Sequence, residues 1–117
     1  MRSDALYVCH VIESIELIES YTKEVNFDEF CVNRMMYDAV VRNLQILAES
    51  TQKISSEIKA KYQQVPWRDI SGFRNILVHD YPEGIDENAM WNVIILDLPK
   101  LKSSFEKIKE EICKKPS

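Results

Sequence analysis

The sequence predicts an all-α protein, a single domain folded as an antiparallel up-and-down bundle of four to five helices. Apolar residues recur at helical spacing along most of the chain. The 117 residues include only two glycines and four prolines, few for a turn-rich β architecture, and no stretch alternates apolar and polar residues as strands do. A chain of this length can bury one core without disulfides or metal. We therefore expect one domain over residues 1–117, with a frayed tail at 114–117.

The first predicted helix begins at a cap formed by Ser3 or Asp4 and fades near Thr22. Its apolar residues fall at i, i+3, i+4, i+7 and i+10, which is one face of a helix. These residues are Val8, Val11, Ile12, Ile15 and Ile18. The loop "VNFDEF" follows, and in it Asp28 is the expected N-cap of the next helix.

The second predicted helix is long, about Glu29 to Ile54. Its apolar stripe comprises Met36, Val40, Leu44 and Leu47. A polar line at i, i+4, i+7 and i+11 runs along the same helix and comprises Asp38, Arg42, Gln45 and Glu49. Two interpretations of this line stay open. It is either a solvated face with helix-compatible charge pairs or part of an internal cleft lined by Arg42 and Glu49.

A short third helix in "SSEIKAKYQQ" ends before Pro66, because proline pushes the preceding residue out of helical geometry. The fourth predicted helix spans about Trp67 to Val78. It contains Gly72, and close packing against another helix would explain a glycine there, since glycine costs a helix about 1 kcal/mol relative to alanine.

The final predicted helix follows the turn "YPEG", begins near Asp86 and runs towards Lys114. Its later apolar stripe comprises Leu101, Phe105, Ile108 and Ile112. Pro99 lies within this span and should kink the helix or split it in two.

The charge pattern limits the classes of function. The formal charge is −4 and the sequence pI about 5.2, so a basic field over the whole molecule that would capture nucleic acid broadly is not expected. From residue 53 to residue 74, however, five basic residues stand against two acidic ones, a local charge of +3. The basic residues are Lys53, Lys59, Lys61, Arg68 and Arg74. A local basic patch on an acidic protein is therefore possible.

The cysteines and histidines exclude further classes. Three widely spaced cysteines without a C-x-x-C pair indicate a reducing compartment and thiols used as small core residues. No apolar run approaches the roughly 20 residues that cross a bilayer, and no cleavage-like site follows the N-terminus. We expect a cytoplasmic protein without membrane contact. His10 and His79 lie far apart, no metal-ligand spacing occurs, and two glycines cannot build a phosphate loop, so no metal or cofactor is expected.

One short segment, "RNILVHDY" at 74–81, concentrates residues that can perform chemistry. An arginine binds phosphate through a planar fork, and imidazole moves protons near neutral pH. With RNA the substrate supplies its own nucleophile, the 2′-hydroxyl, so Arg74 and His79 could cleave it without a metal. On an ideal helix the two positions lie about 140° apart, so either the helix ends before His79 or the groups meet across a cleft.

A purely structural interpretation of the same residues also stays open. His79 near a helix C-terminus would interact favourably with the helix dipole, and Arg74 could pair with Asp69. Tyr81 could be a packed aromatic residue before Pro82.

The segment "PWRDISGFRNILVHDYPEG" (66–84) resembles the HEPN superfamily, specifically HepT-like toxins paired with MntA-type minimal nucleotidyltransferases. The resemblance rests on R-x-x-x-x-H-x-Y, formed by Arg74, His79 and Tyr81, with the polar Asn75 after the arginine. "VVRNLQILAES" (40–50) and "DLPKLK" (97–102) are similar to two further family segments. Gln45 and Ala48 replace the more usual Glu and Gly in the first of these.

The resemblance implies a HEPN-like, homodimeric bundle that acts as a metal-independent endoribonuclease toxin in a type II/VII-like toxin–antitoxin pair. Arg74 would stabilise the phosphate, His79 would be the general acid or base, and Asn75 would orient the pair, with Arg42 and Glu49 in support. Two motif copies would face each other across the dimer cleft. Tyr81 would be the tyrosine to which an MntA-like nucleotidyltransferase antitoxin transfers AMP, which would obstruct RNA.

Two other functions remain possible from the sequence. One is a non-catalytic helical partner or substrate-holding subunit of a minimal nucleotidyltransferase, which fits the acidic pI. The other is a dimeric bundle without preserved activity. An intact Arg74–His79 pair favours the ribonuclease, because a purely structural module does not need it.

Overall fold

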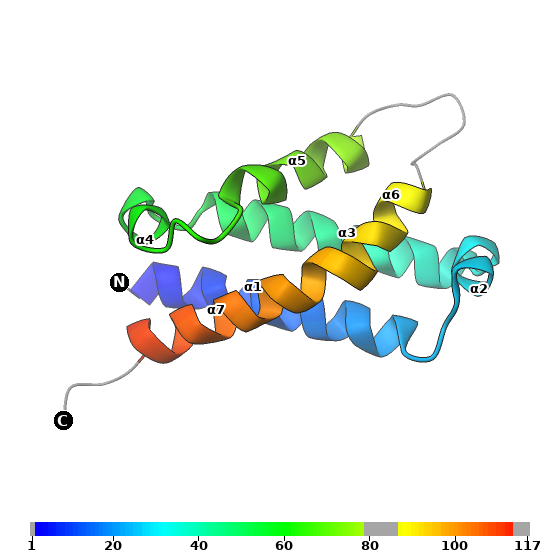
Figure 1. Ribbon diagram of the computed structural model, residues 1–117, viewed down its shortest axis with the longest axis horizontal. Coiled ribbons are helices and arrows are strands. Elements are labelled where there is room, and N and C mark those ends of the chain that lie inside the picture. The colour runs from blue at the N-terminus through cyan, green and yellow to red at the C-terminus, as the bar shows by residue number, and fades with distance from the viewer. Residues whose placement is uncertain (1, 79–86, 114–117) are drawn as a thin grey trace.

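The computed structural model describes residues 2–78 and 87–113, and the described chain is almost entirely helical (Figure 1). Its helices are α1 (Arg2–Thr22), α2 (Phe27–Val32), α3 (Arg34–Gln52), α4 (Ser56–Lys61), α5 (Trp67–Val78), α6 (Glu87–Asn92) and α7 (Leu98–Ile112), with a π-helical segment, η1, at Val93–Asp97. No strand occurs in these two stretches. The predicted all-α class is confirmed.

Long helical rods pack side by side with alternating direction (Figure 1). The helix α1 packs along α3, and α5 covers α3 from another side. The helices α6 and α7, joined by η1, form a continuous rod whose α7 part packs against α1. This arrangement is an up-and-down bundle. The number of helical segments differs from the four to five expected because two of the expected helices are interrupted.

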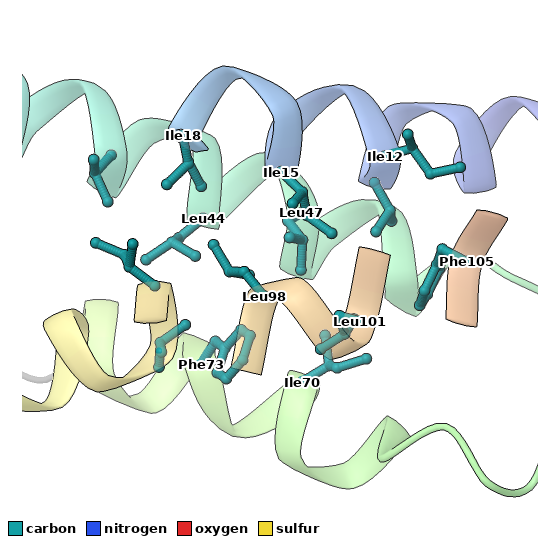
Figure 2. Packing of buried hydrophobic residues seen from close by; sticks show 14 of the residues in the cluster. Ile12, Ile15, Ile18, Leu44, Leu47, Ile70, Phe73, Leu98, Leu101 and Phe105 are labelled. Atoms are coloured by element: carbon teal, nitrogen blue, oxygen red, sulfur yellow. The ribbon is translucent and has the colours of Figure 1, made fainter. Parts of the chain in front are cut away.

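The core lies between these rods and is built from the predicted apolar stripes (Figure 2). All five stripe residues of α1 are buried, as are Val40, Leu44 and Leu47 of α3 and Leu101, Phe105 and Ile108 of α7. From α5, Ile70 and Phe73 point into the same core. Burial of these side chains from water supplies the main force that holds the rods together.

The second predicted helix is in fact two helices that meet at Asn33. The side chain of Asn33 accepts a hydrogen bond from the backbone N–H of Met36 at 3.0 Å and so caps α3. The expected N-cap Asp28 is also wrong, because Asn26 caps α2. Its side chain accepts from the Glu29 N–H at 2.8 Å, while the Glu29 carboxylate accepts from the Asn26 N–H at 3.0 Å.

Asp4 does not cap the first helix, which begins at Arg2. Its side chain is buried, with 3% of the residue exposed, and accepts hydrogen bonds from the backbone N–H and the hydroxyl of Ser55, each at 2.8 Å. The Ser55 hydroxyl oxygen in turn accepts from the Ile58 N–H and caps α4. Asp4 therefore holds the start of α4 against the start of α1.

Pro99 splits the last predicted helix, as expected. Proline has no N–H to donate to the carbonyl four residues earlier, and its ring crowds that carbonyl. The chain responds with the wider turn η1, in which the Leu98 N–H donates to the Val93 carbonyl. The side chains of Ile95 and Leu96 in η1 are exposed.

Two smaller expectations are wrong. Among the residues that the structure describes, no heavy atom of a neighbouring element lies within 4 Å of a Cβ placed on Gly72, so close packing between the described helices does not explain this glycine. The thiols do not serve generally as core residues, because Cys9 and Cys31 are only half-buried and Cys113 is exposed.

Candidate functional site

The helix α5, which carries the first part of the "RNILVHDY" segment, is anchored firmly at its N-terminal end. The Ile70 N–H donates to the Pro66 carbonyl at 3.1 Å, and the Trp67 indole N–H donates to the Tyr62 carbonyl at 3.0 Å. The Trp67 ring meets the Phe105 ring of α7 edge to face, with centroids 5.6 Å apart. Figure 2 shows Ile70 and Phe73 packed beside Leu101 and Leu98 of the α6–η1–α7 rod. The predicted bounds of this helix, Trp67 and Val78, are confirmed.

The structure places the predicted catalytic residues only in part. Positions 74 and 75 lie on the C-terminal half of α5, one residue and two residues after the buried Phe73. His79 and Tyr81 lie outside the described residues. The proposed pairing of Arg74 with His79 thus stays a prediction.

Arg42 and Glu49 are both exposed on α3, the helix against which α5 packs. The Asp38 carboxylate pairs with Arg34, one turn before it on the helix, and not with Arg42, one turn after it; the Arg34 Nε lies 3.2 Å from the Asp38 Oδ1. Because this ion pair is exposed, it contributes little to stability. The exposure of Asp38, Arg42 and Glu49 favours the solvated-face interpretation of the polar line, while a cleft shared with the motif stays a prediction because His79 and Tyr81 lie outside the described residues. Gln45 is half-buried.

A hollow of about 270 Å³ lies beside α5, on the side that faces the η1–α7 junction. Its wall combines apolar and charged side chains: Gln64, Pro66, Asp69, Phe73, Asp97, Lys100, Leu101 and Ser104. Phe73 directly precedes Arg74, so this hollow adjoins the motif helix. The sequence did not predict it, because its walls come from segments about 30 residues apart and no local spacing joins them.

Of the basic residues predicted to form a local patch, Lys53, Lys59 and Lys61 lie at or near α4, and each of them packs over an aromatic ring. The Lys59 ammonium is 5.9 Å from the centroid of the Trp67 ring, and Lys61 lies 5.6 Å from that of Tyr62. Lys53 lies 5.7 Å from the ring of Tyr7 on α1. The contact with Trp67 places Lys59 of α4 beside the first turn of α5, whereas Lys61 contacts the neighbouring residue at the end of α4.

Within residues 2–78 and 87–113, no three histidine, cysteine, aspartate or glutamate side chains gather closely enough to hold a metal ion. None of the described helices is long and apolar enough to cross a membrane.

Comparisons with known proteins agree with one another. Residues 11–108 match the family described as Ribonuclease HepT-like. A protein of Methanocaldococcus jannaschii named "Gamma-glutamylcyclotransferase and putative RNase" is 40% identical over 115 residues. The match covers 97% of this chain and 51% of that relative, so the chain spans about half the relative's length.

Two further relatives match over nearly their full length. The "Probable ribonuclease HepT" of Thermococcus cleftensis is 35% identical over 109 residues, which are 93% of this chain and 98% of the relative. A "Putative RNase" of Methanocaldococcus jannaschii is 35% identical over 105 residues, 90% of this chain and 95% of the relative. No solved structure matches the chain.

Proposed function

The chain belongs to the ribonuclease HepT-like family, and on that premise we propose that it is a metal-independent endoribonuclease with Arg74 and His79 as its catalytic pair. The observation that carries this proposal is the R-x-x-x-x-H-x-Y segment at 74–81, which lies inside the matched residues 11–108. The anchoring of α5 supports it, because a catalytic arginine needs a rigid element to hold it in place.

The proposed reaction uses the 2′-hydroxyl of RNA as the nucleophile. Its oxygen attacks the adjacent phosphorus, the bond from phosphorus to the 5′-oxygen breaks, and a 2′,3′-cyclic phosphate remains. One proton leaves the 2′-hydroxyl and another reaches the departing 5′-oxygen. His79 serves as the general base or general acid in these transfers. The Arg74 guanidinium stabilises the charge that develops on the phosphate oxygens, and Asn75 orients the pair.

We propose that the active form is a homodimer in which two copies of the motif share one cleft. A second copy would bring a second His79, so that one imidazole could accept a proton while the other donates one. Arg42 and Glu49 lie exposed on the helix beside α5, and they would act in support of the motif at such a shared surface.

We also propose that Tyr81 is the control point of a toxin–antitoxin pair. An MntA-like nucleotidyltransferase would attach AMP to its hydroxyl. The added phosphate carries negative charge and bulk two residues from His79, and it would repel the RNA backbone electrostatically and block it sterically.

The decisive experiment measures cleavage of mixed RNA by the purified protein in the presence of EDTA. The His79→Ala variant tests the catalytic pair. His10→Ala is the matched control, because His10 lies on α1 with its ring stacked edge-on against Tyr7, 6.1 Å between centroids. Mass spectrometry of the intact protein establishes beforehand that Tyr81 carries no AMP.

We expect wild type and His10→Ala to leave cyclic phosphate ends, and His79→Ala to lose at least a hundred-fold in rate, the usual contribution of general acid–base catalysis, about 10²–10⁴. Cleavage that persists in His79→Ala would reject the proposed pair. Intact RNA with an unmodified wild-type dimer would instead favour the substrate-holding partner of a nucleotidyltransferase.

A further inference from the structure

We propose that Lys59, Lys61 and Arg68 form a phosphate-binding surface that holds single-stranded RNA on its way into the cleavage motif. This surface, called here the α4–α5 cationic surface, comprises those three residues. The inference rests on the proposed ribonuclease function and adds to it the part of the chain that holds the substrate outside the reacting bond.

The charge of the chain is divided unevenly. The segment from residue 53 to residue 74 carries a formal +3, and since the whole chain carries −4, the remainder carries −7. Binding of a polyanion by a protein with this overall charge requires a local surface of the opposite sign. The α4–α5 cationic surface lies within this positive segment.

The three cations are available to a ligand. Lys61 and Arg68 are exposed and Lys59 is half-buried. None of them forms an ion pair with any carboxylate in the described part of the chain. The acidic residues of the segment, Glu57 and Asp69, are likewise exposed and bound to none of the three.

Aromatic rings lie against two of the three cations. Lys59 lies over the ring of Trp67, and Trp67 donates its indole N–H to the Tyr62 carbonyl, while Lys61 lies over the Tyr62 ring. Arg68 follows Trp67 in the first turn of α5. The contacts of Trp67 thus join the end of α4 to the start of α5, and the packing of Lys59 over its ring reduces the conformational entropy that this lysine would lose on binding phosphate.

The position of the surface suits a strand that continues to the motif. Arg68 and position 74 lie on the same helix, six residues apart, which is about 9 Å along the axis at 1.5 Å per residue. That span corresponds to about three stacked nucleotides at 3.4 Å each. Six residues also turn about 120° around an ideal helix, so a single strand that reaches the motif would curve around α5 to lie against its first turn and the adjoining lysines of α4.

The test measures binding of a fluorescein-labelled RNA oligonucleotide with 2′-O-methyl groups at several salt concentrations. This probe lacks the 2′-hydroxyl nucleophile, so it binds without being cleaved. The test variant is Lys59→Gln with Arg68→Gln. The matched control is Lys23→Gln with Arg34→Gln, which removes one lysine and one arginine from the opposite end of the bundle, where α2 lies (Figure 1).

For single strands, log K falls with log[salt] with a slope of about −0.7 per phosphate contact. Loss of two contacts should make the slope less steep by about 1.4 and weaken binding at 0.1 M salt about 25-fold, which is 10 to the power 1.4. The control variant should keep the wild-type slope. The charge-retaining variant Lys59→Arg with Arg68→Lys should keep most of the wild-type slope. That result would show that the loss of charge, and not the loss of the native side chains at these two positions, changes the slope in the test variant.

An unchanged slope in the test variant, or an equal change in test and control variants, would overturn the proposal. The same proteins are then given unmodified RNA. If wild type and the test variant cleave it with the same KM, the ribonuclease function stands and the binding surface falls. If wild type does not cleave the RNA, but the binding slopes of wild type and the test variant differ as expected, the binding surface stands and the ribonuclease function falls.

Discussion

Asp4 shows how a single buried carboxylate determines the arrangement of two helices. Its two oxygens accept the backbone N–H and the hydroxyl of Ser55, 51 residues away in the sequence. Through Ser55, the same contact caps α4, the helix that carries Lys59 and Lys61 of the α4–α5 cationic surface. The position of a side chain near the N-terminus therefore bears on where these two cations lie.

We predict that Asp4→Ala destabilises the fold by about 2 kcal/mol, because the Ser55 N–H and hydroxyl lose their acceptor in a partly buried place. The melting temperature should fall by about 10 °C for a chain of this size. Glu13→Ala, an exposed change on the same helix, is the control and should have little effect. Differential scanning calorimetry measures both, and equal melting temperatures would contradict the assigned role of Asp4.

At the scale of elements, α5 combines a firm anchor with a weak point. Its first half is held in the core by Trp67, Ile70 and Phe73. Gly72 lies in its middle, and a Cβ added there would contact no neighbouring element of the described chain. A glycine there lowers the helix's stability without serving close packing inside one chain. Its place on the motif helix makes the outcome of a substitution informative about function.

We predict that Gly72→Ala stabilises the protein by up to about 1 kcal/mol, the difference in helix propensity between the two residues. Urea unfolding measures the change, and Ser71→Ala, at an exposed neighbouring position, is the control. Destabilisation by Gly72→Ala would contradict this expectation. If that loss grew with protein concentration, it would show that a second copy of the chain occupies the space beside Gly72.

At the scale of the whole molecule, Tyr62 connects the end of α4 to the last turns of α7. The tyrosine is buried and its hydroxyl donates to the carboxylate of Glu111, 49 residues later. Burial, followed by the hydrogen bond to Glu111, raises the pKa of Tyr62 from 10.0 to about 12. The folded protein therefore favours the neutral phenol more strongly than the unfolded chain does.

The raised pKa predicts a loss of stability in alkali. The contribution of Tyr62 is complete below pH 10, and it is lost as the pH rises from about 10 towards 12, because only the unfolded chain ionises readily in that range. Tyr62→Phe should remove this part of the pH dependence and cost about 1 kcal/mol at pH 7. Tyr21→Phe, at an exposed tyrosine, is the control for unfolding curves at pH 7, 10 and 11.5. A slope that Tyr62→Phe leaves unchanged would reject the assignment.

Local patterns determined most of the secondary structure of this protein. The apolar stripes of α1, α3 and α7 are buried as predicted except at Met36 and Ile112, which are half-buried, and Pro66 places the start of α5 where the sequence predicted it. Pro99 divides the last helix for the same kind of reason. These features depend on the backbone geometry of a proline or on hydrogen bonds and side-chain spacing within a few residues, so the sequence alone contains the information.

Two features predicted wrongly from the sequence also have local causes: the cap of α2 at Asn26 and the break between α2 and α3 at Asn33. Both asparagines accept hydrogen bonds from N–H groups three residues later. The apolar stripe of the predicted helix begins only at Met36, so it carried no information on the residues before the break at Asn33. The cap signal was present in the sequence, because each asparagine satisfies backbone donors that a helix end leaves free.

For the candidate site, the sequence determined the chemical types and their order: an arginine and an asparagine on a helix, then a histidine and a tyrosine. Only the tertiary structure decided what surrounds that helix. The hollow between α5 and α7, the contact of Lys59 with the Trp67 ring, and the links from Asp4 and Tyr62 join residues whose meeting depends on how whole helices pack. A periodic apolar stripe predicts which face of a helix is buried. The neighbour that each buried side chain contacts depends on close packing between helices, which no local sequence pattern predicts.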